Sequence, residues 1–205
     1  MDFSISKLSE SRIRQIINSN SWSPDCPVSI DMLREVHILH KDFNGVTKKG
    51  ILIVNYIVAI NTLNIFKNLF LLEFPIEKAI PIEQYDCSDY HSMADNNSSG
   101  FNCRKISNTD KWSSHSYGMA IDINPIQNPC ITINENAGNA EILPSNGSKY
   151  LNRKFIRLGM VESIVKIFSE NQFTVWGGDW NNPLDYHHFQ VPWDIINKEK
   201  QNMFK

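Results

Sequence analysis

The chain has 205 residues, of which 41% are hydrophobic and 20% are charged, as in an ordinary globular protein. This length suits one domain with a buried core. The formal net charge is −2 and the pI is about 6.3, so the basic footprint of a nucleic-acid-binding protein is absent and no nucleic-acid partner is expected.

The first element expected is a helix over residues 4–19, with Ile13, Ile16 and Ile17 on one face. The stretch SWSPDCP (21–27) breaks it. We therefore predict an N-terminal helical extension over residues 1–27 and a main domain over residues 28–205. The starting sequence lacks a charged region followed by an apolar one, so it does not resemble a secretion signal.

The most apolar stretch, residues 51–74, has the length of a membrane span. Polar and charged residues interrupt it: Asn55, Asn61, Asn64, Lys67, Asn68 and Glu73. We therefore expect a long buried or amphipathic helix over most of residues 52–73, and no membrane span. The preceding DFNG (42–45) predicts a turn, and the polar residues 85–112 predict a long loop of functional importance or disorder.

The second half of the chain alternates short strands with one helix. MAIDIN (119–124), FTVWGG (173–178) and YHHFQV (186–191) are expected to be strands, and residues 160–170 a helix. Helices first and strands later indicate an α+β protein, with a small antiparallel sheet flanked by helices.

The four cysteines are Cys26, Cys87, Cys103 and Cys130. No C-x-x-C pair is present, which argues against a cysteine zinc knuckle. Reduced thiols and one or two disulfides are all compatible with the spacing. If a bridge forms, Cys87–Cys103 is the preferred pair, because both residues flank one polar loop.

A possible metal site begins in the stretch SSHSYGMAIDIN (113–124). A turn at Gly118 followed by a strand would let His115 and Asp122 converge on one ion. Histidine and aspartate are suitable ligands for a catalytic zinc, which takes three protein ligands and leaves one position open. A third ligand is available from the adjacent His187 and His188, of which at most one should bind, because neighbouring strand residues point to opposite faces.

Each motif also has an ordinary interpretation. An aspartate before a strand can cap a turn, and paired histidines can be half-buried polar residues. The joint occurrence favours a metal, and Asp185, three residues before His188, is suited to act as a general base. A structural zinc site would need a fourth ligand, and none stands at a suitable spacing.

The motifs resemble those of a known family. Ser113-x-His115-x-x-Gly118-x-Ala120-x-Asp122 matches the signature of the D-alanyl-D-alanine carboxypeptidase-type zinc peptidases, and Asp185-x-x-His188 matches their second motif. This family includes vancomycin-resistance carboxypeptidases and phage L-alanyl-D-glutamate peptidases, and it shares its metal fold with the hedgehog signalling domain. The family's surrounding sequence is also matched, by FNCR (101–104), DINPIQNP and WGGDW (176–180). The resemblance therefore runs from about residue 28 to about residue 193.

The resemblance implies a role for each matching residue. His115, Asp122 and His188 would bind Zn²⁺, on the sheet of a hedgehog/DD-peptidase-like fold. Asp185 would be the general base that takes a proton from the attacking water, and Arg104 would hold the carbonyl oxygen. The alternative for Arg104 is a surface residue of a polar loop.

Other assignments have ordinary alternatives of equal weight. Trp176 and Trp180 would line a substrate groove or belong to the core. Asp179 would orient a ligand histidine or cap a turn. Ser113 would position its loop or contact substrate. Two tyrosines, Tyr117 and Tyr186, are weaker candidates for hydrogen-bond donors to substrate. Four histidines have no matching partners and are expected to be ordinary polar residues: His37, His40, His91 and His187.

The family's substrates are peptides with D-amino acids, above all the stem peptide of bacterial peptidoglycan. An aspartate at position 185 favours the L-alanyl-D-glutamate endopeptidase branch, whereas the FNCR context favours a D-alanyl-D-alanine carboxypeptidase. A non-catalytic, zinc-containing peptidoglycan-binding module is a third possibility. The intact Asp185 and Arg104 argue against it, because a binder needs neither.

The expected site of action is the cell wall or periplasm. Without a recognisable export signal, three routes are open: release as a phage lysis enzyme, delivery as a secretion-machine effector with residues 1–27 for docking, or recycling of wall fragments in the cytoplasm. A monomer is expected, and a secretion-machine or inhibitor partner is left open.

Overall fold

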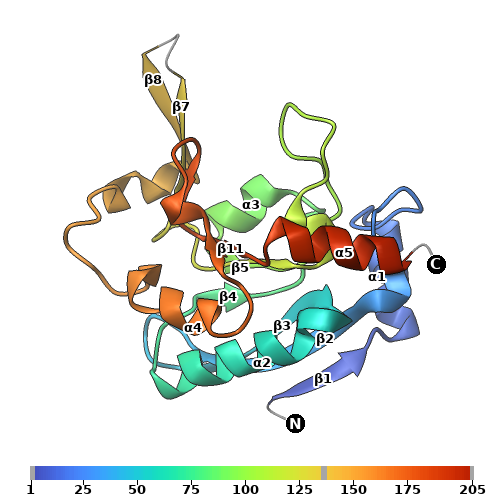
Figure 1. The fold of residues 1–205 in the computed structure, drawn as a ribbon. Helices are drawn as coiled ribbons and strands as arrows, with labels where there is room; N and C mark the ends of the chain where they lie inside the picture. The colour runs from blue at the N-terminus through green and yellow to red at the C-terminus, as the bar shows by residue number, and fades with distance from the viewer. Residues whose placement is uncertain (1–2, 135–137, 204–205) are drawn as a thin grey trace.

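The computed structural model describes residues 3–134 and 138–203. These residues form a mixed α/β structure, in which three small antiparallel sheets and one parallel strand pair are accompanied by several helices (Figure 1). The strands are β1 (Ser4–Lys7), β2 (Leu33–Lys41), β3 (Thr47–Asn55), β4 (Lys78–Ala79), β5 (Asn97–Ser98), β6 (Ala120–Asp122), β7 (Cys130–Asn134), β8 (Asn139–Leu143), β9 (Val175–Trp176), β10 (Leu184–Asp185) and β11 (His188–Gln190). The α-helices are α1 (Glu10–Asn18), α2 (Tyr56–Leu71), α3 (Asp89–Ala94), α4 (Val165–Ser169) and α5 (Trp193–Met203).

The N-terminal segment differs from the single helix expected over residues 4–19. It forms strand β1, which pairs antiparallel with β2, and then helix α1. The hydroxyl of Ser9 caps α1 by accepting a hydrogen bond from the backbone N–H of Arg12, at 3.2 Å, which explains why the helix begins after this serine. Ile16 of α1 is fully buried against the domain. The domain boundary after residue 27 stays a prediction.

The largest sheet has the order β1-β2-β3, and α2 lies along it (Figure 1). The predicted turn over residues 42–45 is confirmed, because Asp42 Oδ1 accepts hydrogen bonds from the N–H groups of Asn44 and Val46, both at 2.9 Å. The helix predicted over residues 52–73 starts only at Tyr56. Asn55 caps it by accepting from the N–H of Ile57, and the apolar residues before the cap belong to strand β3. No helix among the described residues is long and apolar enough to cross a membrane.

A disulfide is present, but the preferred Cys87–Cys103 pairing is wrong. Cys103 is instead bonded to Cys26, 77 residues earlier in the chain. The backbone explains this choice, because the N–H of Cys103 donates to the carbonyl of Ser21 at 3.1 Å and so brings the cysteine to the 21–26 segment. Cys87 is a free thiol that donates to the carbonyl of Ser19 at 2.8 Å.

The later strands were predicted in the right places but are shorter than expected. They form the sheet β6-β11-β9, while β10 pairs with the hairpin β7–β8, which projects from the body (Figure 1). The helix expected over residues 160–170 is a 3₁₀ turn, Val161–Ser163, followed by α4. Phe168 of α4 stacks on Phe189 of β11, with ring centroids 3.9 Å apart, and so packs the helix against the sheet. The polar segment 85–112 contains α3 and β5.

Candidate metal centre

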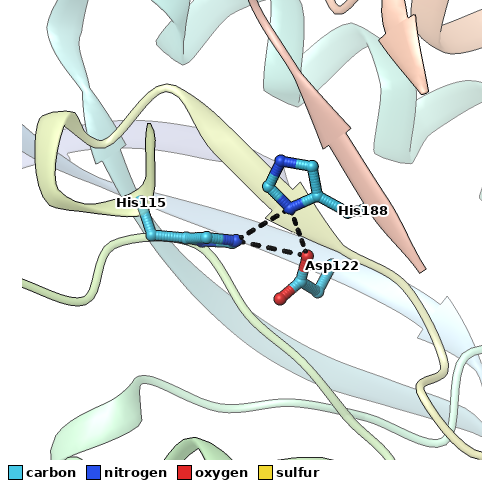
Figure 2. A group of neighbouring side chains, drawn as sticks. All are labelled: His115, Asp122 and His188. Carbon is cyan, nitrogen blue, oxygen red and sulfur yellow. Dashed lines mark hydrogen bonds and ion pairs between the residues drawn. The ribbon is translucent and has the colours of Figure 1, made fainter. Parts of the chain in front are cut away.

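Three segments bring His115, Asp122 and His188 together (Figure 2). His115 lies on a short 3₁₀ helix, Ser114–Tyr117, and Asp122 ends strand β6. His188 begins β11 and stands directly opposite Asp122 in the antiparallel pair. Gly118 makes the turn between helix and strand, with φ +66°, and a Cβ there would lie 2.6 Å from the backbone nitrogen of Asn55. The motif glycine therefore allows this turn to pack closely against the backbone of Asn55.

The three side chains form a nearly equilateral triangle of ligand atoms. His115 Nε2 lies 3.2 Å from Asp122 Oδ1, and His188 Nδ1 lies 3.1 Å from the same oxygen. The two histidine nitrogens are 3.2 Å apart. Tetrahedral zinc with bonds of about 2.0–2.1 Å needs ligand atoms roughly 3.3 Å apart, so the triangle has the dimensions of such a site. All three residues are buried.

The outer nitrogen of each histidine is bonded to a protein oxygen. His115 Nδ1 lies 2.6 Å from the carbonyl oxygen of Gly100, and His188 Nε2 lies 2.9 Å from Oε1 of Gln190. In the neutral imidazole the single ring proton then sits on these outer nitrogens. The inner nitrogens consequently point lone pairs at the carboxylate of Asp122. Two imidazole nitrogens and one carboxylate oxygen directed at one point are a donor set that could hold a metal cation.

Neighbouring charges shift the pKa values of His115 and Asp122. Burial lowers the pKa of His115, but the carboxylate of Asp122 outweighs burial and raises it overall. Burial raises the pKa of Asp122, but the neighbouring His115 and His187 hold it well below its usual range. Asp122 is therefore an ionised carboxylate, the form in which it can bind a metal.

A cavity of about 320 Å³ lies beside the three ligands, and its walls include Asp89, Arg104, Trp180, Asp185 and Trp193. The Trp180 ring is 5.3 Å from the ring of His188, measured between centroids. Trp176, for which a groove position and a core position were both open, does not line this cavity. It stacks on Phe189 and donates from Nε1 to the carbonyl of Tyr186 at 2.9 Å, so it belongs to the packing beneath the sheet.

Asp185, the predicted base, lies in the cavity wall on strand β10. His187 Nε2 is 3.0 Å from Asp185 Oδ1, and His187 Nδ1 is 2.8 Å from the carbonyl oxygen of Asn128. The expectation that His187 has no matching partner is therefore wrong. Burial lowers the pKa of this histidine, but the carboxylates of Asp185 and Asp122 outweigh burial and raise it to about 9.

Arg104 is held by the side chains of Asp89 and Ser116. Its guanidinium forms an ion pair with Asp89, whose other carboxylate oxygen accepts from Asn102 Nδ2 at 2.7 Å. The Ser116 hydroxyl accepts from the N–H of Arg104 at 2.9 Å and donates to its carbonyl at 2.6 Å. A positive charge thus stands in the cavity wall, on a loop tied to the helix that carries His115.

The remaining predicted residues lie outside the cavity. Ser113 caps the 3₁₀ helix, since its Oγ accepts from the N–H of His115 at 3.3 Å. Asp179 holds neither ligand histidine, because Gly100 and Gln190 already bond their outer nitrogens. Tyr117 is buried, with its ring edge-to-face against Trp193, and Tyr186 carries Arg153 over its ring.

Sequence reasoning missed Gly100, Asp89, His187 and Gln190. Gln190 had a local signal, because it stands two residues after His188 on the same strand and so shares its face. Asp89 and Gly100 had none, since they reach the centre only through long-range packing.

The part of the chain that is similar to a known protein family contains this centre. Residues 107–191 match the family model of D-alanyl-D-alanine carboxypeptidases. The matched range contains the three candidate ligands and Asp185, whereas Arg104 precedes it. The resemblance read from the motifs is therefore confirmed over this range, which is shorter than the expected 28–193. No curated protein and no solved structure matches the chain significantly.

Proposed function

We propose that this chain, a metallopeptidase relative that carries the D-alanyl-D-alanine carboxypeptidase signature over residues 107–191, hydrolyses an amide of the peptidoglycan stem peptide with zinc. The observation that carries the proposal is the triangle of buried ligand atoms beside a cavity that also contains Asp185 and Arg104. A carboxylate, a cation and a metal site around one cavity are a set of groups that can hydrolyse an amide.

His115, Asp122 and His188 would hold the zinc. Two imidazoles and one carboxylate are a donor set that zinc favours in catalytic sites. The three contacts of 3.1–3.2 Å leave one side of the triangle free of a fourth protein ligand among the described residues. When bound, zinc supplies Lewis acidity, which polarises a carbonyl and makes water more acidic.

Asp185 would take a proton from the attacking water and later donate it to the departing amine. Its carboxylate lies in the cavity wall, where a substrate amide can reach it. General base catalysis of this kind contributes about 10²- to 10⁴-fold to a rate.

Arg104 would donate hydrogen bonds to the substrate carbonyl oxygen as negative charge develops on it. A fixed donor of this kind is worth on the order of 3 kcal/mol in the transition state. The ion pair with Asp89 and the backbone bonds to Ser116 support this role, because they limit the movement of the arginine.

Two bonds are candidates for cleavage. By family resemblance, an aspartate at position 185 favours the L-alanyl-D-glutamate endopeptidase, which we put first. The description of the matching family favours the D-alanyl-D-alanine carboxypeptidase as the second candidate. A zinc-containing binding module would have no use for Asp185 and Arg104 beside the metal.

We further propose that the protein acts outside the cytoplasm, at the cell wall or in the periplasm. The Cys26–Cys103 disulfide supports this location, because such bonds persist in oxidising compartments.

Mass spectrometry of tetrapeptide and pentapeptide muropeptides, incubated with the zinc-loaded protein, tests the proposal. Release of a stem peptide without its first L-alanine would identify the endopeptidase, and loss of one terminal alanine would identify the carboxypeptidase. Asp185→Asn should retain zinc and lose the activity, whereas Asp31→Asn, an exposed control, should retain both. Unchanged spectra with zinc bound would contradict a peptidase and favour the binding module.

A further inference from the structure

His187 lies between the backbone carbonyl of Asn128 and the carboxylate of Asp185. Its Nδ1 lies 2.8 Å from the carbonyl oxygen of Asn128, and its Nε2 lies 3.0 Å from Asp185 Oδ1. Only 3% of the histidine is exposed, so water does not compete for either contact. The hydrogen bond to Asn128 and the burial leave the ring little freedom to turn, and they hold Nε2 within ion-pair distance of Asp185 Oδ1.

The anchor of this histidine is itself fixed. Asn128 is fully buried, and its side-chain amide donates to the carbonyls of Ile123 and Asn124, both at 3.1 Å. Its Oδ1 accepts from the N–H of Val161 at 3.0 Å. Asn128 is thereby tied to the two residues that directly follow Asp122, the last residue of strand β6. His187 thus links Asp185 to the segment that carries a metal ligand.

Asp185 needs such a link because it does not share a sheet with the ligands. Asp122 and His188 lie on the paired strands β6 and β11. Asp185 lies on the two-residue strand β10, which pairs with β7 of the projecting hairpin (Figure 1). Only Tyr186 and His187 separate the two strands in sequence. A catalytic group must be held within about 0.5 Å of its working position, and a two-residue strand alone is a weak support.

We propose that His187 is a positioning residue, which fixes the carboxylate of Asp185 beside the metal centre through the contact between its Nε2 and Asp185 Oδ1. The inference rests on the proposed function in one respect, namely that Asp185 is the base. The Nε2 atom is also 3.9 Å from Asp122 Oδ2, so the imidazole stands between the carboxylate of the base and that of the ligand.

The proposal predicts a specific defect. Without His187, the Asp185 carboxylate can rotate away from the attacking water, while Arg104 and Trp180 still line the cavity. A displacement of about 1 Å costs up to about 100-fold in rate. We therefore expect kcat to fall by about 10- to 100-fold in His187→Ala, with little change in KM and with zinc retained.

Two variants separate positioning from a general structural role. His187→Gln keeps an N–H donor near the place of Nε2, so it should recover most of the lost kcat. His40→Ala is the matched control. His40 is also 3% exposed, and its Nδ1 lies 2.7 Å from the carbonyl oxygen of Ile76, but it lies on β2 and contacts no catalytic group. Its removal should leave kcat per folded molecule unchanged.

The experiment combines zinc content, kcat and KM on muropeptides, and crystal structures of the zinc-loaded parent and variants. The expected result is zinc in every variant, a low kcat in His187→Ala alone, and an Asp185 carboxylate that has moved in that variant and not in His187→Gln. An unmoved Asp185 with parent kcat would overturn the proposal, as would loss of zinc from His187→Ala or an equal kcat loss in His40→Ala. If the parent cleaves no muropeptide, the proposed function fails, and the crystal structures still decide whether His187 holds Asp185.

Discussion

His188 Nε2 lies 2.9 Å from Oε1 of Gln190, two residues further along strand β11. The two side chains point to the same face because side chains alternate along a strand. Gln190 is buried, so this bond fixes the orientation of the imidazole. The consequence is that His188 presents Nδ1, and not Nε2, to the other two ligand atoms.

This bond predicts that Gln190 affects the affinity of the candidate centre for a metal. We expect Gln190→Met to weaken zinc binding by about 10- to 100-fold, because the imidazole loses the acceptor that fixes its tautomer. Gln190→Glu keeps an acceptor at the same place and should remain close to the parent. Competition with a chromogenic chelator measures the affinity, and a parent-like affinity in Gln190→Met would contradict this role.

Removal of a ligand should have a larger effect. His188→Ala is expected to abolish stoichiometric zinc binding, since only His115 and Asp122 remain. Metal analysis after dialysis measures it. His37→Ala serves as the control, because His37 lies on β2 beside Glu35, away from the centre. Retention of one zinc per chain by His188→Ala would mean that the metal is bound elsewhere.

The ion pair of Arg104 with Asp89 predicts two graded defects in turnover. Arg104→Met should lower kcat on muropeptides by about 10²- to 10³-fold, because the carbonyl oxygen loses its fixed donor. Asp89→Asn should cause a smaller loss, because the arginine remains but is held less firmly. Arg14→Met removes an exposed arginine of α1 and should not change kcat. Equal activity of Arg104→Met and the parent would exclude Arg104 from the reaction.

The Cys26–Cys103 disulfide should stabilise the fold strongly. It closes a loop across 77 positions, and the loss of chain entropy in the unfolded state predicts up to about 4 kcal/mol of stabilisation. We expect the double variant Cys26→Ser, Cys103→Ser to unfold at a much lower guanidinium concentration than the parent. Cys87→Ser, which removes a free thiol, should change the midpoint far less. A similar shift in both variants would argue that the bridge does not form.

His40 should make stability depend on pH. Burial lowers the pKa of this imidazole in the folded protein, although the backbone carbonyl of Ile76 partly opposes the shift. Below the ordinary pKa of about 6.5 the unfolded chain therefore binds the proton more readily, and the free energy of unfolding falls as the pH falls. His40→Asn should lack this contribution, so its difference from the parent in urea unfolding should shrink between pH 7.5 and pH 5.5. An unchanged difference would contradict the sign of the shift.

The sequence predicts the candidate ligands and the candidate base better than it predicts the residues that hold them in place. His115, Asp122, Asp185 and His188 lie in two short motifs whose spacing is set by local turns and strands. Partners such as Asp89 for Arg104 are joined only by long-range packing, which leaves no local pattern.

Strand β3 was missed for a different reason. Only Asn55 stands between its apolar residues and those of helix α2, and periodicity does not separate a buried strand from a buried helix. The cap at Asn55 was the available boundary signal. The Cys87–Cys103 preference failed because nearness in sequence did not reflect the contact between Cys103 and the 21–26 segment.

The Cys26–Cys103 disulfide would hold the protein together after a protease cleaves the backbone between the two cysteines. All three candidate ligands and Asp185 follow Cys103 in the chain, whereas β1 and α1 precede Cys26. A single proteolytic nick anywhere between the two cysteines would therefore leave two fragments joined by a covalent bond. The heavier fragment would keep the whole set of metal and base residues, and the lighter one would stay tethered next to the loop of Arg104. In surroundings rich in proteases, the protein would survive such damage as one particle.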